Sequence, residues 1–157
     1  FGMKAHIAVD AESGLVHTVT TTAANEADVE QISDLLHGKE QHVWADSGYR
    51  GAASRVARDD VQWHIAARPS DIAKLPEGRK KAAAQKHEHR KASVRAKVEH
   101  PFLVIKRIFG FAKTRYKGLE KNAHRLFVTC ANARSATSRT PEDVAKGPAC
   151  GAAIAMR

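Results

Sequence analysis

The feature that most constrains the fold is a hairpin pattern near the start of the sequence. The run KAHIAVD alternates polar and apolar residues, as a strand with one buried face does. The letters AESG follow, with Gly14 where a turn most easily takes a positive φ. The run LVHTVTTTA then returns and is rich in β-branched residues. We therefore expect residues 4–23 to form an antiparallel β-hairpin.

The next stretch alternates between helical and extended patterns. Residues 25–38 predict a helix that is capped by Asn25 and ended by Gly38. QHVWAD predicts a short buried strand, and a glycine-punctuated loop then leads into a short helix. VQWHIAAR predicts another strand. This order of elements predicts a mixed α/β domain.

The second half is basic and more helical. Residues 72–89 predict a basic segment that is exposed and either mobile or helical. SVRAKVEHPFLVIKR has the spacing of an amphipathic helix, although Pro101 interrupts it and predicts a kink. A basic loop with interleaved aromatics and a last helix over residues 123–134 follow. We expect one domain over residues 1–134 and an irregular or disordered tail over 135–157.

Charge and cysteine content narrow the class of protein. The 157 residues carry a formal charge of +9, which favours a polyanionic partner such as nucleic acid, with a basic enzyme that lacks such a partner as the alternative. Cys130 and Cys150 form no metal-binding spacing and are interpreted as free thiols of a reducing cytosol. No apolar run reaches membrane-spanning length, so we expect no membrane partner.

Two acids are the candidate catalytic residues. Asp46 follows the apolar run Val43–Ala45, at the carboxyl end of a predicted strand, where functional groups collect in α/β sheets. The alternative is that Asp46 only opens a turn. Glu99 lies one helical turn after Arg95, and Lys106 lies two turns further on. The alternative is that Arg95, Glu99 and Lys106 only form salt bridges along a solvated edge of the helix.

Paired carboxylates on rigid elements suit magnesium, because hard divalent cations take oxygen ligands. Two such ions can activate a nucleophile and stabilise the leaving oxygen of a phosphodiester. Arginine and lysine beside the acids would hold the phosphates of a nucleic acid. The basic loop could grip a DNA backbone through Lys113, Arg115 and Lys117, with Tyr116 stacking on a base.

Several motifs together resemble the insertion-sequence transposases of the DDE class, in particular the insertion sequence 5 group. They are ADSGYRG, the R-x-x-x-E-x-x-x-x-x-x-K signature, FGMKAHIAVDAESGLVHTV, TAANEADV, LLHG and KTRYKGLEKN. The resemblance covers about residues 1–133. It implies a ribonuclease-H-like mixed sheet with flanking helices, and cleavage and joining of DNA that depend on Mg²⁺ or Mn²⁺. The implied partners are transposon ends and target DNA, with a homodimer as the intact enzyme and a prokaryotic cytoplasm as its location.

The resemblance also assigns residues. Asp46 matches the second catalytic Asp and Glu99 the catalytic Glu, so both are predicted metal ligands. Arg95 and Lys106 match the basic residues of the signature, while Ala92 stands where the signature usually has Tyr.

The first catalytic Asp of the group lies on a strand before FGMKAHI, so we expect that central strand, and the acid, upstream of residue 1. This stretch alone is then expected to be inactive and to leave a sheet edge unpaired. Asp10 is interpreted as the first residue of the hairpin turn, and Asp28 as an acid at a helix amino terminus.

The histidines carry weaker predictions. His6 and His17 are expected to face one another across the hairpin. His87 and His89 flank Glu88 in a charged run and are interpreted as solvated, with a metal-binding H-x-H site as the alternative.

Overall fold

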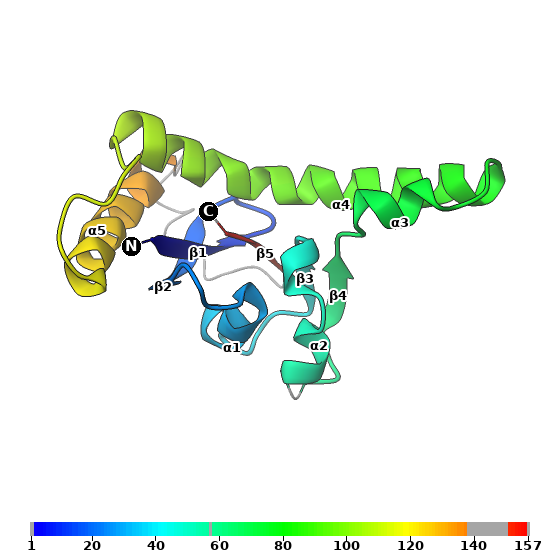
Figure 1. Cartoon of the computed structure of the whole chain (residues 1–157), viewed down its shortest axis with the longest axis horizontal. Helices are drawn as coiled ribbons and strands as arrows, with labels where there is room; N and C mark the ends of the chain where they lie inside the picture. The colour runs from blue at the N-terminus through cyan, green and yellow to red at the C-terminus, as the bar shows by residue number, and fades with distance from the viewer. Residues whose placement is uncertain (1, 57, 138–150, 157) are drawn as a thin grey trace.

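The computed structural model describes residues 2–56, 58–137 and 151–156, with side chains for all of these except 98, 134–137 and 151–156. One mixed sheet of order β2-β1-β5-β3-β4 runs through it. Its strands are β1 (Met3–Asp10), β2 (Val16–Ala23), β3 (His42–Ala45), β4 (Gln62–Ile65) and β5 (Gly151–Met156). Figure 1 shows the sheet between a layer that contains the long α4 and a layer that contains α1 and α2.

The predicted hairpin is confirmed. β1 pairs antiparallel with β2, with Met3 opposite Ala23 and a register shift between Ala8 and Val9. The Asp10 side chain accepts hydrogen bonds from the backbone N–H groups of Glu12 and Ser13, which fixes the turn. Asp10 is therefore a turn residue, as the sequence indicated.

A strand that the sequence did not predict lies at the centre of the sheet. β5 pairs antiparallel with β1 and parallel with β3. The expectation of an irregular tail over residues 135–157 is therefore wrong for residues 135–137, which continue the helix Leu119–Thr137, and for the strand Gly151–Met156. Residues 138–150 of that tail lie outside the described residues. Among the described strands, β5 pairs with both β1 and β3 and fills the space between them. Six residues rich in Ala carry little intrinsic strand preference, so the two neighbouring strands decide this conformation.

Two apolar cores lie on opposite faces of the sheet because strand side chains alternate. One packs β1 and β2 against α4 (Arg79–Leu103), the π-turn η3 (Val104–Ile108) and α5 (Leu119–Thr137), and is formed by Ala5, Ile7, Val9, Val16, Phe102, Val104, Ile105, Leu126, Cys130 and Ala133. The other packs under α1 (Ile32–Leu35) and α2 (Ala52–Arg55), and is formed by Ala8, Ile32, Leu35, Val43, Ala45, Tyr49, Ala52 and Val61.

The helix predicted over residues 25–38 is shorter and divided. A 3₁₀ turn, η1 (Asp28–Gln31), precedes α1. Lys4 on β1 donates to the backbone oxygen of Glu26 and to Asp28 Oδ1, which ties the start of this segment to the sheet. At the other end, the Glu40 carboxylate binds two backbone N–H groups just beyond α1, so the helix stops there.

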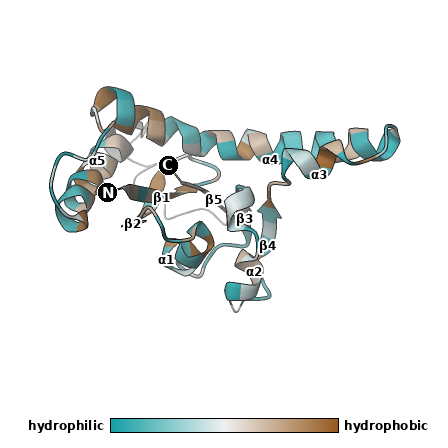
Figure 2. Cartoon of the chain, viewed as in Figure 1, coloured by the Kyte–Doolittle hydropathy of each residue, from teal (hydrophilic) through white to brown (hydrophobic). Residues whose placement is uncertain are grey.

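The basic segment and the amphipathic helix form one element, since α4 begins at Arg79. Together with α3 (Pro69–Ala73), its first half extends beyond β4 and is mostly hydrophilic (Figures 1 and 2). Pro101 lies inside α4, and the backbone widens immediately afterwards into η3, where the Phe109 N–H donates to the Val104 oxygen. The wide turn after Pro101 is the irregularity that the structure shows in this helix.

Candidate functional site

Asp46 lies where the sequence placed it, directly after the parallel strand β3. Val43 and Ala45 are fully buried, so β3 is anchored in the apolar core up to the residue before Asp46. The Asp46 Oδ1 atom accepts a hydrogen bond of 2.8 Å from the Gly48 N–H and caps the 3₁₀ turn η2 (Ser47–Tyr49). Asp46 therefore does open a turn, which is the alternative role that the sequence suggests. Its carboxylate remains partly exposed in this role.

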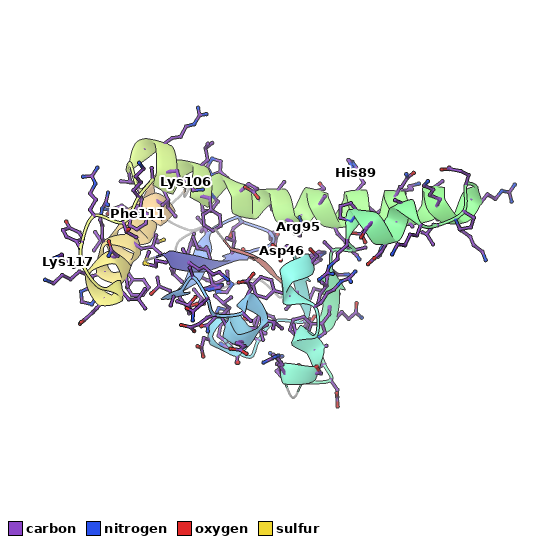
Figure 3. All side chains as sticks on the ribbon, viewed as in Figure 1. Asp46, His89, Arg95, Lys106, Phe111 and Lys117 are labelled. Carbon is purple, nitrogen blue, oxygen red and sulfur yellow. The ribbon has the colours of Figure 1, made fainter. Side chains whose placement is uncertain are left out.

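A groove with a volume of about 760 Å³ opens beside Asp46, and we call it the Asp46 groove. Its walls come from the end of β3, the chain after β4, α3 and α4. They are formed by Asp46, Ser47, Ala66, Ala67, Pro69, Ile72, Ala73, Lys81, Gln85, Glu88, Ala92 and Arg95. Figure 3 shows Asp46 below the middle of α4, close to Arg95. The fold thus brings these two predicted residues to one groove.

Glu99 and Lys106 line a different hollow of about 370 Å³, together with His100, Phe102, Leu103 and Arg107. Glu99 is exposed, one helical turn beyond Arg95 on α4. Lys106 lies in η3, so the spacing between the two residues crosses a π-turn and is not two regular α-helical turns. Among the hollows formed by the described residues, Asp46 and Arg95 therefore line one and Glu99 lines another. Lys106 lines the hollow of Glu99 and also a further hollow beside Met3 and Ala5.

A buried polar network lies beneath Asp46. The Tyr49 hydroxyl is 3.2 Å from His6 Nδ1, and His6 Nε2 is 2.9 Å from Thr22 Oγ1. Burial raises the pKa of Tyr49, and the negative charges of Asp46 and Asp28 raise it further. Burial lowers the pKa of His6, with Lys4 adding to the effect against the opposing charges of Asp28 and Glu26.

The network also corrects the histidine prediction. His6 does not face His17, because the register of the hairpin places Thr20 opposite His6. His17 instead contacts His37, which comes from the loop after α1.

Two acids near Asp46 were assigned other roles from the sequence. Asp28 begins η1 as predicted, but its Oδ2 atom and Asp46 Oδ1 would each lie 3.0 Å from a Cβ atom added at Gly48. Glu88 was interpreted as part of a solvated run, yet it lines the Asp46 groove and accepts from the Ala67 N–H at 3.0 Å. Burial alone would raise the pKa of Glu88, but hydrogen bonds from Lys91 and Ala67 leave it lowered. The local sequence does not indicate that Asp28 and Glu88 lie near Asp46, because each is brought there by the packing of segments that are distant in the chain.

The basic loop between η3 and α5 is exposed and held from below by one buried amide. Asn122 Oδ1 accepts from the backbone N–H groups of Arg115 and Tyr116, and its Nδ2 donates to the oxygens of Tyr116 and Gly118. The side chains that the sequence assigned to DNA contact remain exposed, and they are Lys113, Arg115, Tyr116 and Lys117. In Figure 3, Lys117 lies at the end of the molecule far from α3.

The fold and the site together define a mixed α/β domain with an acidic residue at the end of an interior strand that is parallel to both of its neighbours. This residue lines a groove together with residues of a basic helix. The family model described as "Transposase DDE domain" matches residues 1–133, so the chain belongs to the transposase DDE domain family. No solved structure matches the chain significantly. Among the described residues, no helix is long and apolar enough to cross a membrane.

Proposed function

We propose that the protein acts in DNA transposition, as a metal-dependent enzyme of strand cleavage and strand transfer within the insertion sequence 5 group. The observation that carries this proposal is the Asp46 groove, in which a carboxylate at the end of a buried parallel strand faces Arg95. The family match supports the same class of reaction, and a mixed sheet with helices on both faces agrees with the ribonuclease-H-like fold implied for it.

In this proposal, Asp46 and Glu99 bind Mg²⁺ or Mn²⁺. Their carboxylates fit as donors, because these cations prefer oxygen ligands. When bound, the cation would activate a nucleophile and stabilise the leaving oxygen of a phosphodiester. Glu88, which lines the Asp46 groove, and Asp28, whose Oδ2 atom lies near Gly48, are further oxygen donors close to Asp46. Arg95 and Lys106 would bind DNA phosphates beside the acids.

The proposed DNA path continues onto the basic loop. Lys113, Arg115 and Lys117 would neutralise backbone phosphates, and the exposed ring of Tyr116 would stack on a base. Asn122 makes this surface rigid, which lowers the entropy lost when DNA binds. We further propose that the intact enzyme is a homodimer that binds paired transposon ends.

The second candidate function is DNA binding without catalysis. The observation that favours it is that, among the hollows formed by the described residues, Asp46 lines one and Glu99 lines another. In that case the basic surface would still bind DNA while the chain cleaved none.

The discriminating experiment is a nicking assay on a plasmid that carries the transposon ends, with Mg²⁺ or Mn²⁺. The 157-residue chain is compared with a chain extended upstream through the preceding coding sequence, and with Asp46→Asn and Glu99→Gln in the extended form. We expect nicking by the extended chain and its loss in both variants. Nicking that persists in both variants would refute the assigned acids. DNA binding without nicking by the extended chain would favour the second function.

A further inference from the structure

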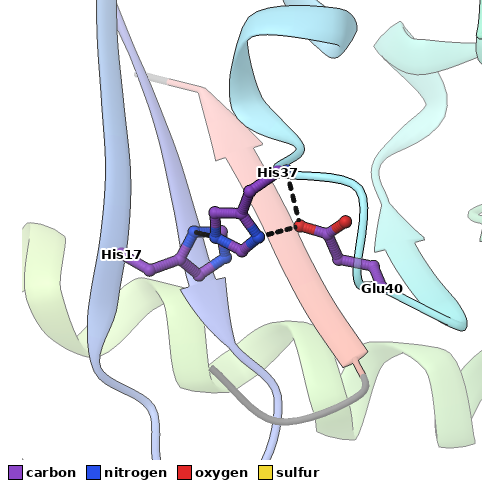
Figure 4. Close-up of side chains that lie close together, drawn as sticks. All are labelled: His17, His37 and Glu40. Atoms are coloured by element: carbon purple, nitrogen blue, oxygen red, sulfur yellow. Dashed lines mark hydrogen bonds and ion pairs between the residues drawn. The ribbon is translucent and has the colours of Figure 1, made fainter. Parts of the chain in front are cut away.

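A second cluster of potential metal ligands lies outside the Asp46 groove. It joins His17 of β2 to His37 and Glu40 of the loop between α1 and β3 (Figure 4). One ligand-type atom from each residue lies within 4.8 Å of the others. His17 Nδ1 is 2.7 Å from His37 Nε2, and His37 Nδ1 is 2.5 Å from Glu40 Oε1.

Glu40 is the fixed member of this cluster. Its side chain is 1% exposed and accepts hydrogen bonds from the backbone N–H groups of His37 and Gly38, at 2.9 and 3.0 Å. Arg58 Nη1 lies 3.4 Å from its other oxygen. Burial alone would raise the pKa of Glu40, but the backbone hydrogen bonds and His37 leave it lowered, so the group is a carboxylate at neutral pH.

This carboxylate sets the tautomer of His37. When Glu40 accepts the Nδ1–H of His37, the Nε2 atom carries a free electron pair and points at His17. Metal-binding histidines are commonly oriented in this way, with the outer nitrogen donating to a carboxylate and the inner nitrogen binding the ion.

We propose that His37 Nε2 and His17 Nδ1 bind a divalent transition-metal ion of the Zn²⁺ class, with Glu40 as the outer partner of His37 and water completing the coordination. Imidazole nitrogens favour Zn²⁺, Cu²⁺ or Ni²⁺ over Mg²⁺, so this site differs in chemistry from the carboxylate ligands proposed for Mg²⁺ or Mn²⁺. The ion takes the place of the hydrogen that lies between the two rings across 2.7 Å. His17 then carries its ring proton on Nε2 instead of Nδ1, so both histidines bind the ion as neutral imidazoles.

The required movement is small. Two nitrogens on a tetrahedral Zn²⁺, each at about 2.0 Å, are about 3.3 Å apart, so the rings must separate by roughly 0.6 Å. The side chain of His37 is 33% exposed and has room to turn. The hydrogen bond between Thr18 Oγ1 and His17 Nδ1, which are 2.8 Å apart, would be lost when Nδ1 binds the ion.

Binding would link β2 to the segment that leads into β3. Because the two ligands are far apart in the chain, the unfolded chain holds no preformed site, and the bound ion stabilises the folded protein. Protons compete for the same nitrogens, so affinity falls on acidification.

The test uses the full chain, prepared without a polyhistidine tag, in zinc titration calorimetry and thermal unfolding. We expect zinc binding with a rise in Tm, both lost in His17→Ala and His37→Ala. Glu40→Gln should weaken zinc affinity by about 10- to 100-fold. If circular dichroism shows that His37→Ala does not fold, His37→Gln replaces it in the test, because residue 37 is exposed and should accept glutamine.

The controls separate this site from others. The second histidine pair, His42 and His64, has ring nitrogens 3.3 Å apart, so His64→Ala is the matched variant and should bind zinc normally. Asp46→Asn and excess Mg²⁺ should also leave zinc binding unchanged, which keeps this test independent of the transposase proposal. Absence of zinc binding by the parent chain, binding that survives His37→Ala and His37→Gln, or loss of binding in His64→Ala would each overturn the site.

Discussion

Asp28 Oδ2 and Asp46 Oδ1 both lie close to Gly48, and each would be 3.0 Å from a Cβ atom added there. One comes from η1 and the other from the end of β3, and the absence of a side chain at Gly48 lets them approach. Lys4 lies 2.9 Å from Asp28 Oδ1 and offsets part of the negative charge. The acidic site is therefore larger than the single aspartate of the sequence motif.

The first prediction concerns this contact. Gly48→Ala should push the two carboxylates apart, lowering stability by about 1 kcal/mol and weakening Mn²⁺ binding, measured by calorimetry. Gly14→Ala is the matched control, because Gly14 has open space around it but a φ of 74° and should lose similar stability through its backbone alone. Equal Mn²⁺ affinity in both variants would show that the carboxylate pair does not contribute to metal binding.

The second prediction concerns the support of the basic loop. Asn122→Ala removes the amide that pairs with four backbone groups, so the free energy of unfolding should fall by about 2 kcal/mol. DNA affinity should fall as well, because the loop loses its fixed shape. Lys121→Ala, at the exposed neighbouring position, controls for the introduction of alanine at this place in α5 and should leave stability unchanged. Urea unfolding and fluorescence anisotropy with labelled duplex measure the two effects, and an unchanged unfolding curve for Asn122→Ala would contradict this role.

The third prediction concerns salt. If the loop cations contact phosphates, the slope of log affinity against log salt should become shallower by about 0.9 for each contact removed. The variants are Lys113→Ala, Arg115→Ala and Lys117→Ala. Tyr116→Ala should lower affinity without changing the slope, because stacking releases no counterions. Identical slopes for the parent chain and all three charge variants would place the DNA elsewhere.

The fourth prediction concerns pH. The pKa of His6 is lowered in the folded protein by burial, from an ordinary value of 6.5. On acidification below about 6.5 the unfolded chain takes up a proton before the folded chain does, so stability is complete above that pH and falls towards the folded pKa. His64 shifts in the same direction through burial and the nearby His42, Lys91 and His87, and adds to the loss.

Urea unfolding at about pH 7.5 and about pH 5.5 measures this effect. The parent chain should be less stable at the lower pH. His6→Gln can keep hydrogen bonds to Tyr49 and Thr22 without titrating, so its stability should depend less on pH. An equal pH dependence in parent and variant would exclude His6 as a source.

The sequence by itself determined the local elements and the place of Asp46. The alternation of polar and apolar residues and the β-branched residues specify β1 and β2, and the turn at Asp10 joins them. A short apolar run specifies β3 and places Asp46 at its end. These features depend on near neighbours in the chain, which is the information that periodicity and turn chemistry contain. The helical pattern around Pro101 is likewise local, whereas the π-turn after it has no signal in the spacing of the apolar residues.

Only the tertiary structure decided which distant groups meet. The six-residue strand β5 exists because β1 and β3 offer hydrogen-bonding edges on either side of it. Packing of segments that are far apart in the chain brings Asp28 and Asp46 to Gly48, brings His17 into contact with His37, and places Arg95 beside Asp46 in one groove. A local pattern specifies a residue's conformation, whereas the partner of its side chain is set by long-range packing, so a site assembled from several segments is completed only in the fold.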